Sequence, residues 1–547
     1  MQPLLSCVEA GELDRTVQER YALPPDLLME NAAAGMFRFL VERYRQQLFP
    51  EQPKRDGPDL LVLCGGGSNG GDALALARHA LFAGVRRVMV LVPSKLSPIA
   101  GRRLAEVQAA GAELLSHDDP AIPLLLNTAS LIVDGLTGSG YRPAPGRSLP
   151  LLDLVRRQRQ APQQQQQQPQ VRALQQSGPP PKQPALPQPK NLPPLIALDL
   201  PSGLCALPSG CLSSEEYAPL PADQTLTVLP AKQELYYPGN RNFTGCISGI
   251  GGVFPLSAIS SKTALLEPGD LSDLLAPPAP DAHKGSRGAL GIYAGDIGSS
   301  GAALLCSRAA SAAGAGTITL HLRDHLYPLL AGSLDNVMAQ PWSAGRNRAY
   351  RALLLGPGLG RDTAAEALLA EAWQSDLPLV LDADALHFTG AYQPRPGAVR
   401  TILLPHPGEY EALLRLSGLL ADTEVDLKQQ ELFNTAELLG QLAVRLQAVV
   451  VLKNSVSWLA HPDGRFLVYE GREPALGCGG SGDILAGFTA ALLVSGLDAW
   501  SAAAAAVLVH GECGKKLAKQ CGYFNPLDVC AEAAVMFYRG ACNEPGA

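Results

Sequence analysis

The sequence predicts an α/β protein built from two doubly wound domains in tandem. Its 547 residues exceed what one compact domain usually holds. Short apolar runs without polar alternation recur along the chain, as expected for strands buried in parallel sheets. A Gly or Asp and then a helical stretch follow these runs, and no short repeat period is present.

The expected strands form two groups, one in each half of the chain. In the first half they are residues 60–64, 87–92, 131–133, 195–198 and 225–229. In the second half they are residues 290–293, 317–320, 352–355, 379–381, 402–404 and 449–452. A polar turn at Ser260, Ser261 and Lys262 separates the groups and leads into the proline-rich sequence LAPPAPDAHKG. We therefore expect one domain at residues 1–256 and a second at residues 257–547.

The composition excludes several classes of protein. Hydrophobic residues make up 46% of the chain and charged residues 17%, which is enough for folded cores. The net charge of −7 argues against binding to nucleic acid or to an anionic membrane. The first residues show no signal-peptide pattern, and the longest apolar run, 484–497, is too short to span a bilayer. The 11 cysteines form no CxxC pair, so we expect reduced thiols and a cytoplasmic location.

One segment, residues 160–194, differs in composition from the rest. It holds 12 Gln and 10 Pro and no acidic residue, so it lacks the apolar surface that would offset its conformational entropy. We expect a disordered loop with polyproline character. An interdomain linker or an SH3 ligand is the alternative. The strand-like runs at 131–133 and 195–198 favour an insertion within one domain.

A glycine-rich turn, GGGSNGGDALALARHA at residues 65–80, follows the first expected strand. Glycines allow a sharp turn that lets helix amides face an anion, although the spacing does not fit the NAD fingerprint. A merely flexible turn needs neither Asn69 nor Asp72. Asp134 and Ser202 follow two other strands, and ligands bind at the carboxyl ends of strands in such sheets. Asn69, Asp134 and Ser202 therefore form a candidate oxygen site for a cation, with helix capping as the alternative for any single Asp.

In the second half, the residues most typical of a catalytic site lie at 475–493. There GGSGD runs directly into an apolar helix, so backbone amides at a helix N-terminus are available to transferring phosphate oxygens. Asp483 lies in the first turn, where it is placed to act as the base for a substrate hydroxyl. An Asp that only complements the helix dipole is the alternative.

The motifs of the first half together resemble the NAD(P)H-hydrate epimerase domain. They are LLMENAAAG (27–35), GSNGGD (67–72), VDGLTGSG (133–140), DLPSG (199–203) and ADQTLTVLPAK (222–232). The resemblance implies a Rossmann-like epimerase fold with K⁺ bound by Asn69, Asp134 and Ser202. It implies contact with hydrated nicotinamide nucleotide at Ser68, Asn69, Gly70, Gly71, Asp72, Gly138, Ser139, Gly140 and Asp199. Asp199 is then the candidate acid–base residue beside C6 of the hydrate, and Lys232 is a weaker candidate.

The motifs of the second half resemble the ribokinase-like, ADP/ATP-dependent NAD(P)H-hydrate dehydratases. They include HKGSRGALGIYAGD (283–296), GPGLG (356–360), DADAL (382–386), PHPGE (405–409) and VVLKNS (450–455), besides the GGSGD turn. The resemblance implies that the hydrate is contacted by Ala302, Gly358, His406 and Asp483. It implies a nucleotide site at Lys453, Asn454, Ser455, Val456, Ser457 and Gly482, used with Mg²⁺. Asp483 is the expected catalytic base.

The two resemblances imply one bifunctional repair enzyme. Its first domain would convert R-NAD(P)H hydrate to the S form, and its second would return the S form to NADH or NADPH. Phosphorylation of the C6 hydroxyl by ADP or ATP would turn that hydroxyl into a good leaving group. Fusion of the two domains resembles the bacterial arrangement, which favours ADP. We also expect a homo-oligomer, whose size the sequence does not define.

The sequence departs from the family patterns at a few positions. Ser68 and Ala73 replace Asn and Gly in the first glycine loop, Asn454 replaces Gly in the LKG motif, and Cys478 lies beside the GGSGD turn. We expect the Ser68 exchange to weaken hydrate contacts rather than remove them, because serine still forms hydrogen bonds.

Two alternatives remain open. One is a vitamin or sugar kinase of the same fold, which GGSGD permits but GPGLG and PHPGE disfavour. The other makes the first half a non-catalytic module that binds RNA or protein. The set Asn69, Asp134, Asp199 and Ser202, together with the acidic net charge, argues against that module.

Overall fold

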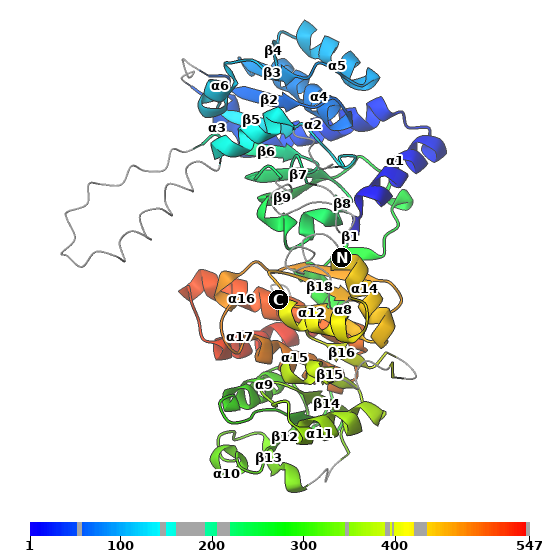
Figure 1. Ribbon diagram of the computed structural model, residues 1–547, viewed down its shortest axis with the longest axis vertical. Coiled ribbons are helices and arrows are strands. Elements are labelled where there is room, and N and C mark those ends of the chain that lie inside the picture. The colour runs from blue at the N-terminus through cyan, green and yellow to red at the C-terminus, as the bar shows by residue number, and fades with distance from the viewer. Residues whose placement is uncertain are drawn as a thin grey trace, which may run out of the picture. The chain divides into compact units, whose positions relative to one another are not determined.

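The computed structural model describes residues 1–51, 57–142, 149–159, 192–204, 219–344, 349–388, 394–395, 399–420 and 435–542 (Figure 1). The chain divides into two compact units, one of residues 4–261 and one of residues 262–547 with residues 1–3. The boundary expected at 256/257 differs slightly from this division and stays a prediction. Both units are built on sheets of mainly parallel strands flanked by helices, so the predicted α/β class is confirmed.

The first unit is built on a parallel sheet. Within the described residues its strand order is β4-β3-β2-β5-β6-β7-β9. The strands are β2 (Leu60–Cys64), β3 (Val88–Val92), β4 (Glu113–Ser116), β5 (Leu131–Gly135), β6 (Leu195–Leu198), β7 (Gln224–Val228) and β9 (Cys246–Ile250). Two further short strands, β1 (Gln2–Leu5) and β8 (Ala231–Lys232), pair through Leu4 and Leu5. The order reverses between β2 and β5, and such a reversal is where doubly wound sheets bind ligands.

Helices cover both faces of this sheet. They are α1 (Cys7–Tyr21), α2 (Pro25–Arg43), α3 (Arg45–Leu48), α4 (Ser68–Phe82), α5 (Pro98–Ala109) and α6 (Ile122–Thr128). Along β2, Leu60 and Val62 pack in one cluster with residues of α2, α4 and α5. Leu61 and Leu63 point to the opposite face and pack with residues of α6. This alternation explains why the strand is apolar throughout and could not show the alternating pattern of an exposed sheet.

Most of the segment expected as a loop, residues 160–191, lies outside the described residues. The strands on its two sides, β5 and β6, are parallel neighbours, with Val133 opposite Ile196. Nη1 of Arg159 donates a hydrogen bond to the Pro193 carbonyl oxygen over 3.0 Å, and Nη2 pairs with Asp223 at 2.6 Å. The described residues on either side of the segment are therefore held together by one side chain.

The second unit holds a larger, mixed sheet. Within the described residues its order is β13-β12-β11-β14-β15-β16-β17-β18-β19-β10. The strands are β10 (Thr263–Leu265), β11 (Ala289–Tyr293), β12 (Thr317–Leu322), β13 (Met338–Pro341), β14 (Ala352–Leu355), β15 (Leu379–Leu381), β16 (Thr401–Leu403), β17 (Val449–Leu452), β18 (Val456–Ala460) and β19 (Phe466–Glu470). Strands β17, β18 and β19 are antiparallel to one another, which we did not predict. The order reverses between β11 and β14.

The helices of this unit are α8 (Leu271–Leu274), α9 (Ser300–Ala312), α10 (Tyr327–Leu330), α11 (Thr363–Gln374), α12 (Pro407–Leu416), α14 (Thr435–Leu446), α15 (Ser481–Ser495), α16 (Ala499–Cys521) and α17 (Pro526–Ala541). Residues of α9, α15, α16 and α17 share one buried cluster with the sheet. Helix α15 lies at the centre of this cluster and is buried along most of its length, which explains its apolar sequence. No helix within the described residues is long and apolar enough to cross a membrane.

Candidate active sites

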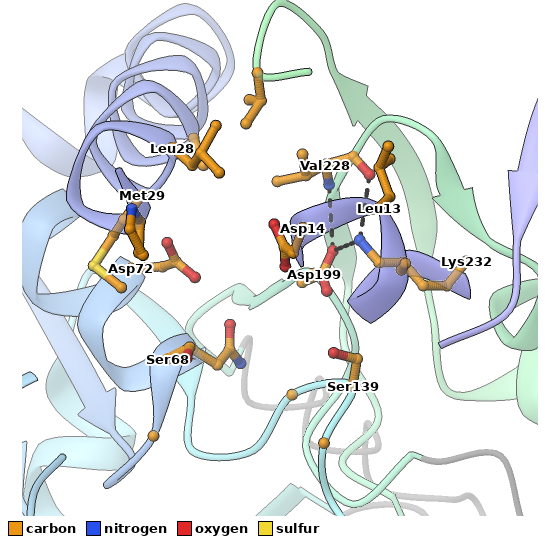
Figure 2. Close-up of a pocket in the computed structure, with 18 of the residues that line it drawn as sticks. Leu13, Asp14, Leu28, Met29, Ser68, Asp72, Ser139, Asp199, Val228 and Lys232 are labelled. Carbon is orange, nitrogen blue, oxygen red and sulfur yellow. Dashed lines mark hydrogen bonds and ion pairs between the residues drawn. The ribbon is translucent and has the colours of Figure 1, made fainter. Parts of the chain in front are cut away.

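The first unit contains a cavity of about 620 Å³ at the carboxyl ends of β2, β5 and β6 (Figure 2). It lies at the point where the strand order reverses. Among the predicted hydrate-binding residues, those that line it are Ser68, Asn69, Gly70, Asp72, Gly138, Ser139, Gly140 and Asp199. Gly71 is not part of the lining. A Cβ atom there would lie 2.6 Å from Cε of Met29, so this glycine lets α2 and α4 pack closely.

Asp199 and Lys232 form an ion pair in the cavity (Figure 2). Oδ1 of Asp199 also accepts hydrogen bonds from Thr227 Oγ1 at 3.2 Å and from the Val228 amide at 3.3 Å. The φ of Asp199 is 63°, in the left-handed region. Such backbone costs on the order of 1–3 kcal/mol and clusters at functional sites. Asp199 is therefore held rigidly, and Lys232, expected as the weaker candidate, is its direct partner.

Two more carboxyl groups, those of Asp14 and Asp72, line the same cavity. Burial raises the pKa of Asp72 well above its usual value, and the charges of Asp199 and Asp14 add to that rise. Burial also raises the pKa of Asp14, with Lys232 opposing and Asp199 adding. Asp14 comes from α1, and sequence reasoning missed it because nothing in its neighbourhood differs from an ordinary helix surface.

The three predicted potassium ligands converge on Thr137. Nδ2 of Asn69 donates to the Thr137 carbonyl oxygen at 2.7 Å, and the Thr137 amide donates to Ser202 Oγ at 2.9 Å. Ser202 Oγ donates in turn to Asp134 Oδ1 at 2.5 Å. Asp134 is fully buried, and burial raises its pKa to about 6 although Ser202 and Leu136 donate to it. The buried Oδ1 of Asn69 has no hydrogen-bond partner within the described residues.

Two glycines of the first loop are required by close contacts between backbone segments. A Cβ atom at Gly70 would lie 1.9 Å from the Gly65 carbonyl oxygen, and one at Gly65 would lie 1.9 Å from the Leu136 carbonyl oxygen. A Cβ atom at Gly67, in contrast, would meet nothing within 4 Å. Gly65 and Gly70 thus bring the loop after β2 against the end of β5, where Asp134 lies.

In the second unit, charged residues gather at the carboxyl ends of β15, β16 and β17. Lys453, directly after β17, forms an ion pair with Asp382, directly after β15. Lys453 Nζ also lies 4.0 Å from Oε2 of Glu409, which follows β16 in α12. Asp382 is 1% exposed, so this pair is largely shielded from water. Lys453 was expected in the nucleotide site, whereas Asp382 and Glu409 had no predicted role.

Asp483 lies in the first turn of α15, close to this charged group. Burial and then the negative charge of Asp382 raise the pKa of Asp483 to about 6, and Lys453 opposes the rise. The preceding Gly480 caps the helix with a φ of 92°. A Cβ atom on Gly482 would lie 3.6 Å from Lys453 Nζ, so this lysine approaches the helix N-terminus. First-turn amides lack intrahelical acceptors and are free to bind anions.

His406 is the N-cap of α12. Its Nδ1 accepts hydrogen bonds from the amides of Gly408 at 3.0 Å and Glu409 at 3.3 Å. The His406 side chain is 57% exposed, so a ligand can reach it. His510 lies near the GGSGD turn: its Nε2 is 3.0 Å from Ser481 Oγ, and burial lowers its pKa to about 4. A neutral His510 therefore supports Ser481 rather than supplying charge.

Ala302 and Gly358 lie on either side of Ser299, at the reversal between β11 and β14. Ser299 Oγ donates to the Gly358 carbonyl oxygen at 2.9 Å, and the Ala302 amide donates to the Ser299 carbonyl oxygen at 3.2 Å. Gly358 has a φ of 59°, and a Cβ atom there would lie 2.7 Å from Cβ of Ser299. Only glycine fits this position without strain.

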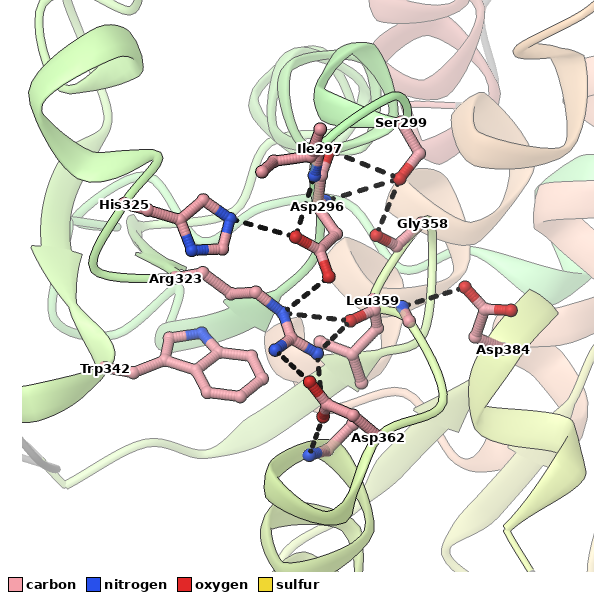
Figure 3. A network of polar contacts seen from close by, with 12 residues as sticks. Asp296, Ile297, Ser299, Arg323, His325, Trp342, Gly358, Leu359, Asp362 and Asp384 are labelled. Atoms are coloured by element: carbon pink, nitrogen blue, oxygen red, sulfur yellow. Dashed lines mark hydrogen bonds and ion pairs between the residues drawn. The ribbon is translucent and has the colours of Figure 1, made fainter.

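Arg323 anchors the loop that carries Gly358 (Figure 3). Its guanidinium pairs with Asp296 at 3.0 Å and with Asp362 at 2.6 Å, donates to the Leu359 carbonyl oxygen at 2.7 Å, and stacks over Trp342 with 4.7 Å to the ring centre. Arg323 holds the pKa of Asp362 at about 2. This network joins the loop after β11 to the loop after β14 and was not predicted.

The remaining predicted nucleotide-binding residues lie in the turn between β17 and β18 and in the first two positions of β18. Asn454 Oδ1 accepts from the Ser455 amide at 2.7 Å, and Ser457 Oγ donates to the Asn454 carbonyl oxygen at 3.2 Å. Asn454 thus shapes this turn. Val456 is fully buried, so in this structure it offers no exposed surface to a ligand. The nucleotide contacts of these residues stay a prediction.

Comparison with known proteins covers most of the chain. Residues 25–234 match the family model described as the N-terminus of YjeF-related proteins, and residues 290–534 match the NAD(P)H-hydrate dehydratase model. The bifunctional NAD(P)H-hydrate repair enzyme of Thermofilum pendens is 30% identical over 93% of this chain and 91% of its own. That of Moorella thermoacetica is 28% identical over 95% of this chain and 93% of its own.

Among solved structures, the ADP/ATP-dependent NAD(P)H-hydrate dehydratase of Bacillus subtilis is 27% identical to this chain. It covers 50% of this chain and 97% of its own, with a TM-score of 0.44. The two family models together span both units, and the relatives match nearly from end to end. The chain therefore belongs to the family of bifunctional NAD(P)H-hydrate repair enzymes.

Proposed function

We propose that the first unit epimerises R-NAD(P)H hydrate to the S form and that the second unit dehydrates the S form to NAD(P)H at the expense of ADP or ATP. The observation that carries the first assignment is the Asp199–Lys232 pair in a polar cavity. The observation that carries the second is Asp483 at a helix N-terminus beside Lys453 and Asp382. Family membership supports both.

Asp199 is placed to exchange a proton at C6 of the hydrate. Inversion at C6 requires either that the hydroxyl leaves and returns or that the ring opens and closes, and both routes need an acid–base group beside C6. Lys232, Thr227 and the Val228 amide all bind Oδ1 of Asp199, which leaves Oδ2 outside these contacts. Oδ2 is the oxygen that we assign to proton transfer.

The cluster around Thr137 fits a potassium ion. Asn69 offers a buried side-chain oxygen without a hydrogen-bond partner, and Asp134 and Ser202 add oxygen ligands nearby. Such a hard oxygen set suits an alkali or alkaline-earth cation. A bound K⁺ would neutralise Asp134 and fix the loop that carries Gly138. Asn69 and Thr137 line the cavity, so the cation site adjoins the substrate site.

Asp483 is the proposed base of the second reaction. It takes the proton of the C6 hydroxyl while a phosphoryl group is transferred to that oxygen, and phosphate then leaves as the ring nitrogen supplies its electron pair. The amides at the start of α15 are placed to bind the transferring phosphate oxygens. Lys453 adds a positive charge near Gly482.

The nucleotide is proposed to occupy the face formed by Lys453, the turn at residues 454–457 and Gly482. Within the described residues no group of three His, Cys, Asp or Glu is arranged to hold a metal ion. Mg²⁺ commonly relies on substrate phosphates and one or two carboxylates, so the site fits an ion that arrives with the nucleotide and screens its phosphates. Asp382, Glu409 and Asp483 are the nearby carboxylates.

The decisive experiment supplies purified R and S hydrates to the full chain with ADP and ATP in parallel. The absorbance of reduced nicotinamide should return from the S form with at least one nucleotide, and from the R form at a rate limited by epimerisation. No recovery from the S form would overturn the dehydratase assignment. In Asp199→Ala the R form should persist while the S form is still consumed.

The same mixtures test the two alternatives. A vitamin or sugar kinase would leave a phosphorylated alcohol as its final product, and the family match over the second unit does not favour it. A non-catalytic first unit would leave the R hydrate untouched in the wild type. We further propose a cytoplasmic homo-oligomer that uses no nucleic-acid or membrane partner.

A further inference from the structure

Asp72 is a carboxyl group in the first cavity that the chemistry above does not use. It lies in the second turn of α4 and lines the cavity. Asp72 is partly buried, and within the described residues its carboxyl group forms no hydrogen bond or ion pair. A carboxyl group that faces a polar cavity without a protein partner is available to a ligand or to a reaction there.

Asp72 and Asp199 lie on opposite sides of the cavity (Figure 2). Asp72 projects from α4, whereas Asp199 follows β6 and is held by Lys232. A six-membered ring that enters between them would present one face to each carboxyl group. Inversion at a ring carbon by loss and return of a hydroxyl needs a proton donor on one face and a proton acceptor on the other.

The two carboxyl groups have different surroundings. Asp199 has an ammonium partner and two further donors, which compensate a negative charge. Asp72 has no such donors; burial and the charges of Asp199 and Asp14 raise its pKa, and only the more weakly acting Lys232 and Arg103 oppose this. Carboxyl groups whose environments differ in this way commonly divide into an acid and a base.

We propose that Asp72 is the general acid of the epimerisation and acts on the C6 hydroxyl from the face of the ring opposite Asp199. This rests on the proposed epimerase function of the first unit. Asp72 gives its proton to the C6 oxygen, the C6–O bond breaks with its electron pair on oxygen, and water leaves. The lone pair of N1 forms the C6–N1 double bond.

Water then adds to C6 on the side of Asp199. One of its protons passes to the Asp199 carboxylate, and the electron pair of the C6–N1 double bond returns to N1. One proton has thus moved from Asp72 to Asp199, and exchange with solvent restores both groups. In the reverse direction the roles of the two carboxyl groups are exchanged.

Asp72→Asn separates this role from simple binding. The amide has the same size and donates hydrogen bonds, but its protons are not acidic enough to be transferred to the leaving hydroxyl. We expect kcat for conversion of the R form to fall by on the order of 100-fold or more, with KM for the hydrate changed by less than about threefold. Asp72→Glu should retain more activity than Asp72→Asn. Turnover of purified S hydrate by the second unit of the same chains should stay unchanged.

Several results would overturn the proposal. One is an Asp72→Asn variant with the full kcat, or with an effect on KM alone. Another is an Asp72→Glu variant that is less active than Asp72→Asn. A third is a lower kcat in Asp14→Asn while Asp72→Asn keeps its rate. A wild-type chain that does not convert the R form would instead overturn the proposed epimerase function itself. The two failures are therefore distinguishable.

A second measurement uses only the wild-type chain and so does not depend on the folding of a variant. Epimerisation in ¹⁸O-labelled water should place one solvent oxygen at C6 for each inversion, after subtraction of the exchange seen without enzyme. Retention of the original oxygen through inversion would show that the hydroxyl does not leave. That result would overturn the role of Asp72 as the acid.

Discussion

Each unit holds a lysine–aspartate ion pair at the carboxyl ends of its strands, and the two pairs differ in what they expose. In the first unit Asp199 of the pair lines the substrate cavity itself. In the second unit Asp382 of the pair is almost fully buried, and the proposed base is the neighbouring, partly buried Asp483. An ion pair of the same type therefore contains the proposed proton-transfer group in one unit and shifts the pKa of the proposed base in the other.

The largest expected effect is at Asp483. Asp483→Asn removes the base and should lower dehydration of S hydrate by roughly 10²–10⁴-fold. Epimerisation of the R form in the same chain should be unchanged and serves as the control. Recovery of reduced-nicotinamide absorbance with ADP or ATP measures the first rate, and chiral separation of the hydrates measures the second. A variant that dehydrates at full rate would contradict the assignment.

Substitution of Lys232 and Lys453 tests whether each lysine acts on the reaction of its own unit. Lys232→Met leaves Asp199 with hydrogen bonds from Thr227 and Val228 only, so it should lower epimerisation by on the order of 10–100-fold and leave dehydration intact. Lys453→Met should lower dehydration and leave epimerisation intact. Because Lys453 opposes the raised pKa of Asp483, its loss should also move the acid limb of the dehydration rate to higher pH. An unchanged limb would show that Lys453 does not tune Asp483.

The two reactions should depend on pH in opposite directions. Asp483 must be ionised to act as a base, so dehydration should fall as pH drops through about 6. Asp72 must be protonated to act as an acid, so epimerisation should fall as pH rises through its elevated pKa. The charged residues that influence this pKa are Asp14, Asp199, Lys232 and Arg103. Rate profiles of kcat for each pure hydrate check both signs. Parallel profiles would contradict one of the two assignments.

A smaller effect is expected at Arg323. Arg323→Gln should loosen the Gly358 loop, because the ties to Asp296 and Asp362 are lost. We expect kcat/KM for S hydrate to fall by on the order of 10-fold, mainly through KM, since Arg323 positions the loop and does not touch the proposed base. Arg361→Gln, which removes an exposed pair with Asp384, is the matched control and should change little.

The smallest effect concerns stability. Gly70→Ala places a methyl group against the Gly65 carbonyl oxygen and should lower the free energy of unfolding by about 1–3 kcal/mol. Gly67→Ala lies three residues away in open space and should change it by much less. Denaturant unfolding of both variants checks the difference. Equal stability of the two variants would show that the loop moves to accept the methyl group.

The sequence predicted the buried strands well, because a strand covered on both faces is apolar throughout. Residues 60–64, 195–198, 352–355, 379–381 and 449–452 are strands with the expected bounds. β4 was missed, since Glu113 and Ser116 are exposed at the sheet edge and interrupt the apolar run. The antiparallel arrangement of β18 and β19 was missed for a different reason. The direction and order of strands depend on which strands pair, and a short apolar run does not specify its partner.

The candidate sites were predicted only where glycines and strand ends mark them. Asn69, Asp134, Asp199 and Ser202 follow predicted strands, and the structure brings Asn69, Asp134 and Ser202 together around Thr137. Asp14 could not be found in this way, because it lies on a helix far along the chain from the residues it joins. The Arg323 network was likewise invisible, since its partners come from three separate loops.

The hydrogen bond from Arg159 to Pro193 has a consequence for the evolution of chain length. Because one side chain already spans the two sides of the Gln/Pro-rich segment, the span that any connector must bridge there is short and fixed. Closing a flexible loop costs only about 0.6 kcal/mol more for each doubling of its length. We therefore expect a change in the number of residues between Arg159 and Pro193 to alter the free energy of unfolding little.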